Sequence, residues 1–115
     1  MAAPNIVNVS TIIGKSATIA LTSTNATALV SNAASSSKVF KINMIQVANV
    51  DGSNACAVTI DMHSAAAGGG TAYSIMSEVT VPAKASIVAL DKNTAVYLEE
   101  DRSITATAGT ASDLE

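Results

Sequence analysis

The chain has 115 residues, of which 49% are hydrophobic, 13% are charged and 3% are aromatic, and its formal net charge is -3. This length fits one domain built around one core. Six Lys and Arg residues against nine Asp and Glu residues exclude the basic surface that phosphate neutralisation requires, so we expect no nucleic-acid partner. No apolar run approaches the roughly 18 to 20 residues of a membrane span, so we expect no membrane partner.

The composition favours β-strands over helices. The chain holds 11 Val, 10 Ile and 12 Thr residues, which are stiff at χ1 and suit a pleated sheet. Short strand-like runs with polar turns between them predict an all-β fold, an antiparallel β-sandwich or jelly-roll-like single domain over residues 1–115. In chain order, the predicted strands are 6–13, 16–21, 26–30, 39–48, 55–63, 72–75, 78–81, 86–90, 95–98 and 103–108.

The first two predicted strands are separated by Gly14-Lys15, a turn-forming pair. Residues 1–9 have no charged side chain and contain Pro4, followed by strand-forming residues. Edge strands have unpaired backbone groups that can pair with another chain. We therefore expect residues 1–9 to form an extended N-terminal arm or an edge strand that takes part in self-association.

In the middle of the chain, the apolar parity of residues 39–48 changes once, between Met44 and Ile45. This change predicts a β-bulge, or a strand whose second half is covered on both faces. The Asp51-Gly52 pair that follows lies between two strand-like runs and predicts a hairpin. Residues 55–63 alternate most clearly between apolar and polar side chains. From these parities, the predicted core includes Phe40, Ile42, Val58, Ile60, Ile87, Leu98 and Ile104.

Few side chains offer chemistry. His63 is the single histidine, and neither a second His nor a Cys stands at metal-ligand spacing, so we expect a structural or surface role for it. Cys56, the single cysteine, precedes His63 by seven residues, which places the two on opposite faces of one strand and disfavours a nucleophilic pair. The acidic run 99–101 lacks the alternating Asp pattern that surrounds calcium and is interpreted as a solvated turn.

The glycine run 68–70 superficially resembles a phosphate-binding loop. Such loops lead into a helix N-terminus and usually contain a Lys, and this run has neither feature. We interpret residues 65–70 as a flexible hairpin loop with little reason to hold one conformation. The sequence therefore predicts no catalytic residue, no metal ligand and no cofactor, and a protein that is not an enzyme.

Three stretches carry a resemblance to a known family. They are NIVNV (5–9) with Gly14-Lys15, KVFKIN (38–43) through ANVDG (48–52), and VPA (81–83) through LDK (90–92) to VYLEED (96–101). They resemble small structural proteins of marine tailed bacteriophages, cyanophages especially, over nearly the whole chain. The resemblance implies a β-sandwich that joins a virion. The proteins that it resembles continue past residues 113–115 with another strand, which leaves the last sheet partner open.

The resemblance implies a capsid decoration (cement) protein that stabilises the head shell by non-covalent binding between capsomers. The expected partners are further copies of the chain, in a homo-oligomer that we expect to be a trimer, and the major capsid protein or other virion proteins. The expected location is the virion, at the capsid surface or head-to-tail region, after synthesis in the host cytoplasm. A head-to-tail connector, neck or tail protein is the alternative. A host-glycan-binding module is a further alternative, disfavoured because sugar platforms use aromatic rings and the chain has three, Phe40, Tyr73 and Tyr97.

Overall fold

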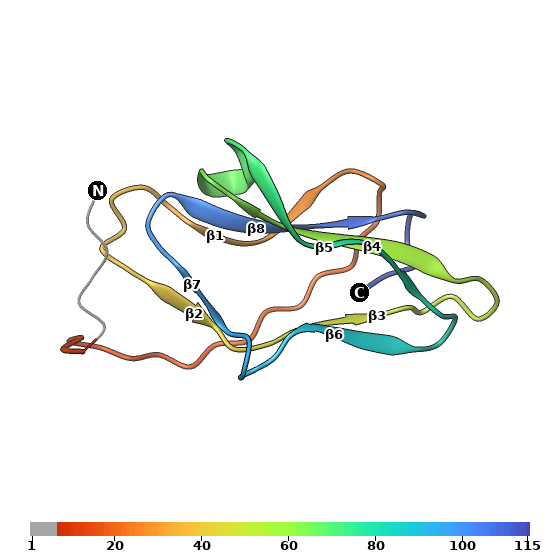
Figure 1. Ribbon diagram of the computed structural model, residues 1–115, viewed down its shortest axis with the longest axis horizontal. Coiled ribbons are helices and arrows are strands. Elements are labelled where there is room, and N and C mark those ends of the chain that lie inside the picture. Colours follow the sequence, from red (N-terminus) through yellow and green to blue (C-terminus); the bar gives the residue numbers. More distant parts are fainter. Residues whose placement is uncertain (1–6) are drawn as a thin grey trace.

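The computed structural model describes residues 7–115 (Figure 1). Its strands are β1 (Thr27–Asn32), β2 (Phe40–Ile42), β3 (Ile45–Ala48), β4 (Cys56–His63), β5 (Ala72–Val81), β6 (Ser86–Leu90), β7 (Val96–Leu98) and β8 (Arg102–Ala108). A single 3₁₀ turn in the described residues, η1 (Ala66–Gly68), lies between β4 and β5. The strand pairs are antiparallel, so the predicted all-β fold is confirmed.

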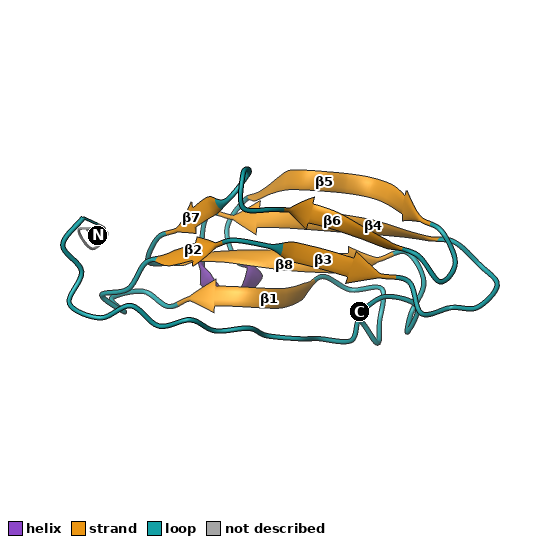
Figure 2. Ribbon diagram, turned by 90° about the horizontal axis from the view of Figure 1, so that it is seen from below, coloured by secondary structure: helices purple, strands orange, loops and turns teal. Residues whose placement is uncertain are grey.

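The strands form two layers, which lie above one another in Figure 1. One layer is a four-stranded sheet in the order β1-β8-β4-β5. The other consists of two strand pairs, β2-β7 and β3-β6, placed end to end so that β2 leads into β3 and β6 leads into β7. The molecule is elongated along the strands, with extents of 48 × 26 × 19 Å (Figure 2).

The alternation predicted for residues 55–63 places β4 at the centre of the core. Cys56, Val58 and Ile60 are buried between the layers, whereas the intervening Ala57 and Thr59 are half-buried. The neighbouring strand β8 is covered on both faces. Its apolar residues at 104, 106 and 108 join the core, and its hydroxyl residues at 103 and 105 lie under η1. A central strand covered twice explains why β8 does not show a simple polar–apolar alternation of burial.

Of the seven predicted core residues, four are fully buried and three are only partly buried. Val58, Ile60, Leu98 and Ile104 belong to the buried cluster. Phe40, Ile42 and Ile87 pack against that cluster but keep some exposure. For Phe40 and Ile42 the reason is local, because both line a groove at one edge of the sandwich.

Two predicted strand boundaries differ from the structure at the points where the backbone is irregular. The run 39–48 divides into β2 and β3 at Asn43-Met44, and the β3-β6 register shifts at Ile45, next to the predicted parity change. Conversely, 72–75 and 78–81 are one strand, β5, with register shifts against β4 and with Glu78 at φ 48°. A bulge lets one strand continue through residues that read as a break in the sequence.

The hairpin predicted at Asp51-Gly52 is wrong. The strands on either side do not pair with each other, because β3 pairs with β6 in one layer and β4 pairs with β5 and β8 in the other. The segment between them is an arch that crosses from one layer to the other. Asp51 Oδ1 accepts hydrogen bonds from the backbone N–H groups of Ser53 at 2.8 Å and Asn54 at 3.3 Å, so the local turn forms without the strand pairing.

The two N-terminal strand predictions are also wrong for the described residues. Residues 7–20 contain no strand, Leu21 forms an isolated bridge with Leu114, and the first strand, β1, begins at Thr27. Ile6, at the start of the first predicted strand, and residues 1–6 of the predicted arm lie outside the described residues. The strand propensity of this segment is real, but residues 8–20 have no hydrogen-bonded neighbour among the described residues.

Candidate functional site

His63 is a structural residue of the outer sheet face. It is 8% exposed, its Nε2 lies 2.9 Å from Thr105 Oγ1, and its Nδ1 lies 3.2 Å from the carbonyl oxygen of Gly69. One ring nitrogen therefore faces strand β8 and the other faces the loop that follows β4. The imidazole ties this loop to the sheet, in line with the structural reading of the sequence.

The loop at 65–70 is held by many contacts, so the expectation that it has little reason to hold one conformation is wrong. Three successive backbone N–H groups donate to side-chain oxygens: Ala66 to Asp101 Oδ1 at 3.0 Å, Ala67 to Ser31 Oγ at 2.9 Å and Gly68 to Ser103 Oγ at 2.9 Å. Ser103 Oγ in turn donates to the carbonyl oxygen of Ala65 at 2.8 Å. Because these N–H groups already have acceptors, they cannot form a cradle for a phosphate.

Cys56 lies at the opposite end of β4 from His63. Its side chain is buried in the core, and its sulfur accepts a hydrogen bond from the backbone N–H of Thr110 at 3.3 Å. Seven residues of extended strand place the two side chains about 23 Å apart. The structure therefore does not bring the thiol and the imidazole together.

The acidic run 99–101 is only partly the solvated turn that the sequence indicated. Glu99 is exposed, but Glu100 is buried and Asp101 is half-buried, with Asp101 used as an acceptor for the loop after β4. Within residues 7–115, no three His, Cys, Asp or Glu side chains gather as a group that could hold a metal ion. The same residues contain no helix long and apolar enough to cross a membrane.

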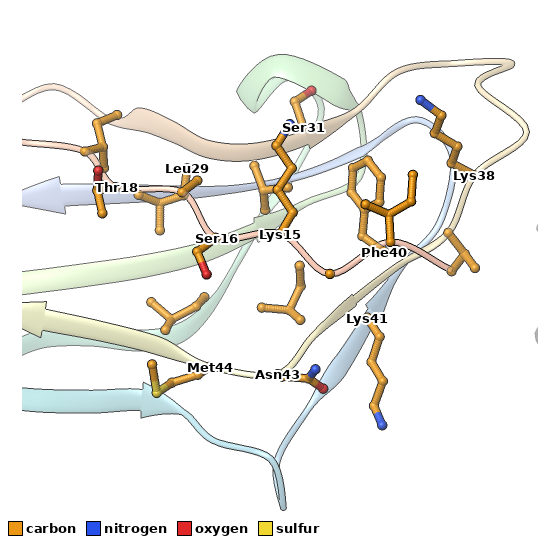
Figure 3. A pocket seen from close by; sticks show the side chains of 18 of the residues that line it. Lys15, Ser16, Thr18, Leu29, Ser31, Lys38, Phe40, Lys41, Asn43 and Met44 are labelled. Carbon is orange, nitrogen blue, oxygen red and sulfur yellow. The ribbon is translucent and has the colours of Figure 1, made fainter. Parts of the chain in front are cut away.

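The most distinctive surface is a long groove at one edge of the sandwich. It lies between β1, the edge strand of the four-stranded sheet, and the β2–β3 stretch of the other layer. Residues 8–21 run along it, and Figure 3 shows Lys15, Ser16 and Thr18 on this segment, with Leu29 of β1 on one side and Met44 on the other. The groove holds about 1970 Å³, larger than the ~300 to 1,000 Å³ of small-molecule sites, and its shape follows the strands.

The last residues of the described chain set the width of this groove. Leu114 forms antiparallel bridges with Leu21 on one side and Asn49 on the other. Glu115 and Ala48 exchange two backbone hydrogen bonds, at 2.8 and 2.9 Å. Neighbouring strands lie about 4.8 Å apart, so Leu21 and Asn49 are separated by the width of one intervening strand.

The segment along the groove has strand-type residues but no strand bonding. Residues 8–20 make no hydrogen bond with any described residue, through either backbone or side chain. Ile12 and Ile13 are 85% and 79% exposed. On the other wall of the groove, β2 pairs with β7 and β3 pairs with β6, and on their second side only Ala48, at the end of β3, bonds to Glu115 in the described residues. The groove thus combines unpaired backbone groups on both walls with exposed apolar side chains. These two features are typical of a surface that binds another strand.

The aromatic rings do not form a shared platform. Phe40 lines the groove, whereas the exposed Tyr73 and Tyr97 belong to β5 and β7, which lie in different layers. Sequence reasoning missed the groove, because exposure and the absence of a bonding partner depend on the packing of the two layers. The chemistry that the arrangement supports is strand addition and apolar contact.

Comparison of the chain with models of protein families, with curated proteins and with solved structures finds no match to any of the three.

Proposed function

We propose that this protein is a structural component of a phage virion, and that it binds the outer shell as a capsid decoration protein. The observation that carries the proposal is the segment along the groove. Its residues 8–20 make no hydrogen bond with a described residue, and its Ile12 and Ile13 side chains are exposed. The phage-like stretches of the sequence support the setting. A connector, neck or tail role remains the alternative within the same structural class.

The physical basis of decoration is the burial of weakly solvated surface. With 13% charged residues, the chain has little electrostatic repulsion to keep identical copies or a shell protein apart. Binding across a joint between capsomers stabilises the assembled shell, because the bound copy would have to be released before the joint opens. No bond is made or broken covalently in this process.

The test is to add the purified chain to particles of the phage that encodes it and to measure binding, copy number and the temperature at which the shell opens. Decoration predicts shell-wide density, a copy number in the hundreds and a higher opening temperature. About a dozen copies or fewer, localised at the head-to-tail junction, would instead support the neck alternative. Binding to a glycan array without binding to particles would support the glycan-binding alternative and contradict both structural roles.

A truncation locates the binding surface. Removing residues 2–9 should weaken particle binding or self-association more than it changes the circular dichroism of the domain, since within residues 7–115 the buried core begins at Leu21. The matched control is Val88→Asp, a substitution at an exposed position of β6. If the truncated protein unfolds, these residues belong to the folded domain and the arm interpretation is wrong.

A further inference from the structure

We propose that Asp51-Gly52 is a site of spontaneous isomerisation, at which Asp51 converts to isoaspartate, and that the arch containing this pair restrains the reaction in the folded chain. The arch is the segment that leads from β3 to β4. The inference goes beyond the proposed function, because it concerns the chemistry of a single chain and is tested without particles.

The reaction needs only the two residues and water. The backbone nitrogen of Gly52 attacks Cγ of Asp51, a C–N bond forms, and one carboxyl oxygen leaves as water with the acid proton and the amide proton. Water then opens the five-membered succinimide ring. Addition at the side-chain carbonyl restores aspartate, whereas addition at the main-chain carbonyl gives isoaspartate, in which the backbone runs through the former side chain. The mass of the chain is unchanged, and nothing is oxidised or reduced.

The residue that follows each aspartate singles out Asp51. Asp51 precedes a glycine, whereas the other four aspartates of the sequence precede Met, Lys, Arg or Leu. Ring closure brings the nitrogen of the following residue against the carboxyl group, and a glycine has no Cβ to obstruct that approach. The Gly52 N–H donates no hydrogen bond to a described residue, so the attacking nitrogen is not held elsewhere. Asp51 therefore has the most favourable local chemistry of the five for ring closure.

The arch fixes the torsions that ring closure has to change. The succinimide ring contains the Cα–C and Cα–Cβ bonds of Asp51, so its closure sets both torsions. The main chain of Asp51 is tied on either side, since its N–H donates to Asn49 Oδ1 at 2.9 Å and its carbonyl oxygen accepts from the Lys84 N–H at 3.1 Å. Its carboxylate accepts from the backbone N–H groups of Ser53 and Asn54 and from the Asn54 side chain. Ring closure therefore requires a local opening of the arch.

The same hydrogen bonds keep the carboxyl group in its less reactive form. The Ser53 backbone N–H and the Asn54 side chain hold the pKa of Asp51 below its ordinary value of 3.8. The neutral acid loses an oxygen as water far more readily than the carboxylate does, because the carboxylate lacks the proton that makes this oxygen a leaving group. At neutral pH the folded arch therefore contains less of the reactive acid than an unfolded Asp-Gly sequence does.

The turn after β6 provides a matched comparison within the chain. Asp91 Oδ1 accepts from the N–H groups of Asn93 at 2.8 Å and Thr94 at 3.1 Å, the same pattern as at Asp51. The main chain of Asp91 is held differently, because its N–H and its carbonyl oxygen both bond to Thr94 of the same turn. Lys92, not a glycine, follows Asp91. The two turns therefore separate the effect of the glycine from the effect of the bond to another element.

The experiment incubates the full chain, folded in buffer and unfolded in guanidinium chloride, at the same neutral pH and temperature. Peptide mapping by liquid chromatography and mass spectrometry separates isoaspartate from aspartate at each position, since the two have equal mass but different retention. Isoaspartate should form at Asp51. It should form about tenfold or more faster in the unfolded chain, which corresponds to an opening cost of about 1.4 kcal/mol or more for the arch.

Two substitutions test the two parts of the proposal. Gly52→Ala should nearly abolish the reaction in the unfolded chain. The fold should tolerate this change, because the added Cβ would meet the Cε atom of the exposed Lys84 side chain at 3.3 Å and that side chain is free to move. Lys92→Gly should create a new site at Asp91. In the folded chain this site should react faster than Asp51, because the main chain of Asp91 bonds only within its own turn.

Each contrary outcome overturns one part of the proposal. If isoaspartate fails to form at Asp51 in the unfolded chain, or forms equally at Asp91, the assigned site is wrong. Equal rates at Asp51 in the folded and unfolded wild-type chain would show that the arch exerts no restraint. A Lys92→Gly chain that reacts no faster at Asp91 than at Asp51 would show that the bond to Lys84 is irrelevant. The unfolded-state measurements decide the site even if a variant fails to fold.

Discussion

The two long edges of this sandwich are built differently. At one edge the chain passes from β5 to β6 through a short turn at 82–85, in which Ala85 donates to the carbonyl oxygen of Pro82 at 3.1 Å and Lys84 donates to that of Asp51 at 3.1 Å. At the other edge, β1 and β3 are joined to nothing across the groove except at the end where Leu114 lies. A short connection between layers closes one edge, whereas the opposite edge keeps backbone groups of its edge strands without a strand partner among the described residues.

The same residue type has opposite environments in the core and along the groove edge. Ile60, in the middle of β4, is completely buried, while Ile12 is 85% exposed beside the groove. Both belong to strand-forming runs of the sequence. The difference shows that apolar content alone does not decide burial, because burial also requires a neighbour on the correct side.

Truncating the two isoleucines is the strongest test of this contrast. Ile60→Ala should lower the free energy of unfolding by about 2 to 5 kcal/mol, since it leaves a cavity in the packed core. Ile12→Ala should change the same quantity by no more than about 0.5 kcal/mol in dilute monomer. Urea denaturation followed by circular dichroism measures both. A cost for Ile12→Ala close to that for Ile60→Ala would show that residues 8–13 are packed in the monomer.

A second test compares two asparagines on the same stretch of chain. Asn49 is buried and its Nδ2 donates to the carbonyl oxygens of Val81 at 2.9 Å and Asn54 at 3.0 Å, which joins the arch to β5. Asn49→Ala should cost about 1 to 3 kcal/mol of unfolding free energy, because it leaves buried backbone groups unpaired. Asn43 is exposed and serves as the control, and Asn43→Ala should be close to neutral. Equal costs in thermal unfolding would contradict the role assigned to Asn49.

A third test compares two glycines, one in the loop after β4 and one in the segment along the groove. At Gly70, φ is +69° and a Cβ would clash with Ser64 Oγ, so Gly70→Ala should destabilise the fold by about 1 to 3 kcal/mol. At Gly14 a Cβ would meet nothing within 4 Å, so Gly14→Ala should change stability by no more than about 0.5 kcal/mol. Chemical denaturation of the two variants gives both values. A neutral Gly70→Ala would mean that the loop after β4 can adopt another conformation at little cost.

The smallest expected effect concerns pH. Hydrogen bonds from the Ser53 backbone and the Asn54 side chain hold the pKa of Asp51 below its ordinary value of 3.8. A lowered pKa means that the stabilisation by the ionised carboxylate is fully present above pH 3.8 and is lost as the pH falls through the lower folded-state pKa. Asp51→Asn should therefore make stability slightly less dependent on pH on the acid side. An NMR titration that placed the pKa of Asp51 at or above 3.8 would contradict this.

Local sequence patterns determined the all-β class and most of the strands. The run 86–90 is a strand with the predicted bounds, and the alternation in 55–63 identified the buried face of β4, because period-2 patterning is a local property. The interpretations of His63 and Cys56 also depended only on their spacing along one strand. The imidazole lies on the outer face of the sheet with Thr105, and the thiol lies in the core. These features do not depend on which strands become neighbours.

Strand pairing was decided only by the tertiary structure. The Asp51-Gly52 turn forms as its residues indicate, yet the strands that it joins belong to different layers, because β3 and β4 find better-placed partners in β6 and β8. The fixed conformation of the loop at 65–70 likewise depends on acceptors from Ser31, Asp101 and Ser103, which are distant in the chain. For residues 8–20, propensity predicts strands, but a strand also needs a partner for its backbone, and the packing of the described residues does not place one beside this segment.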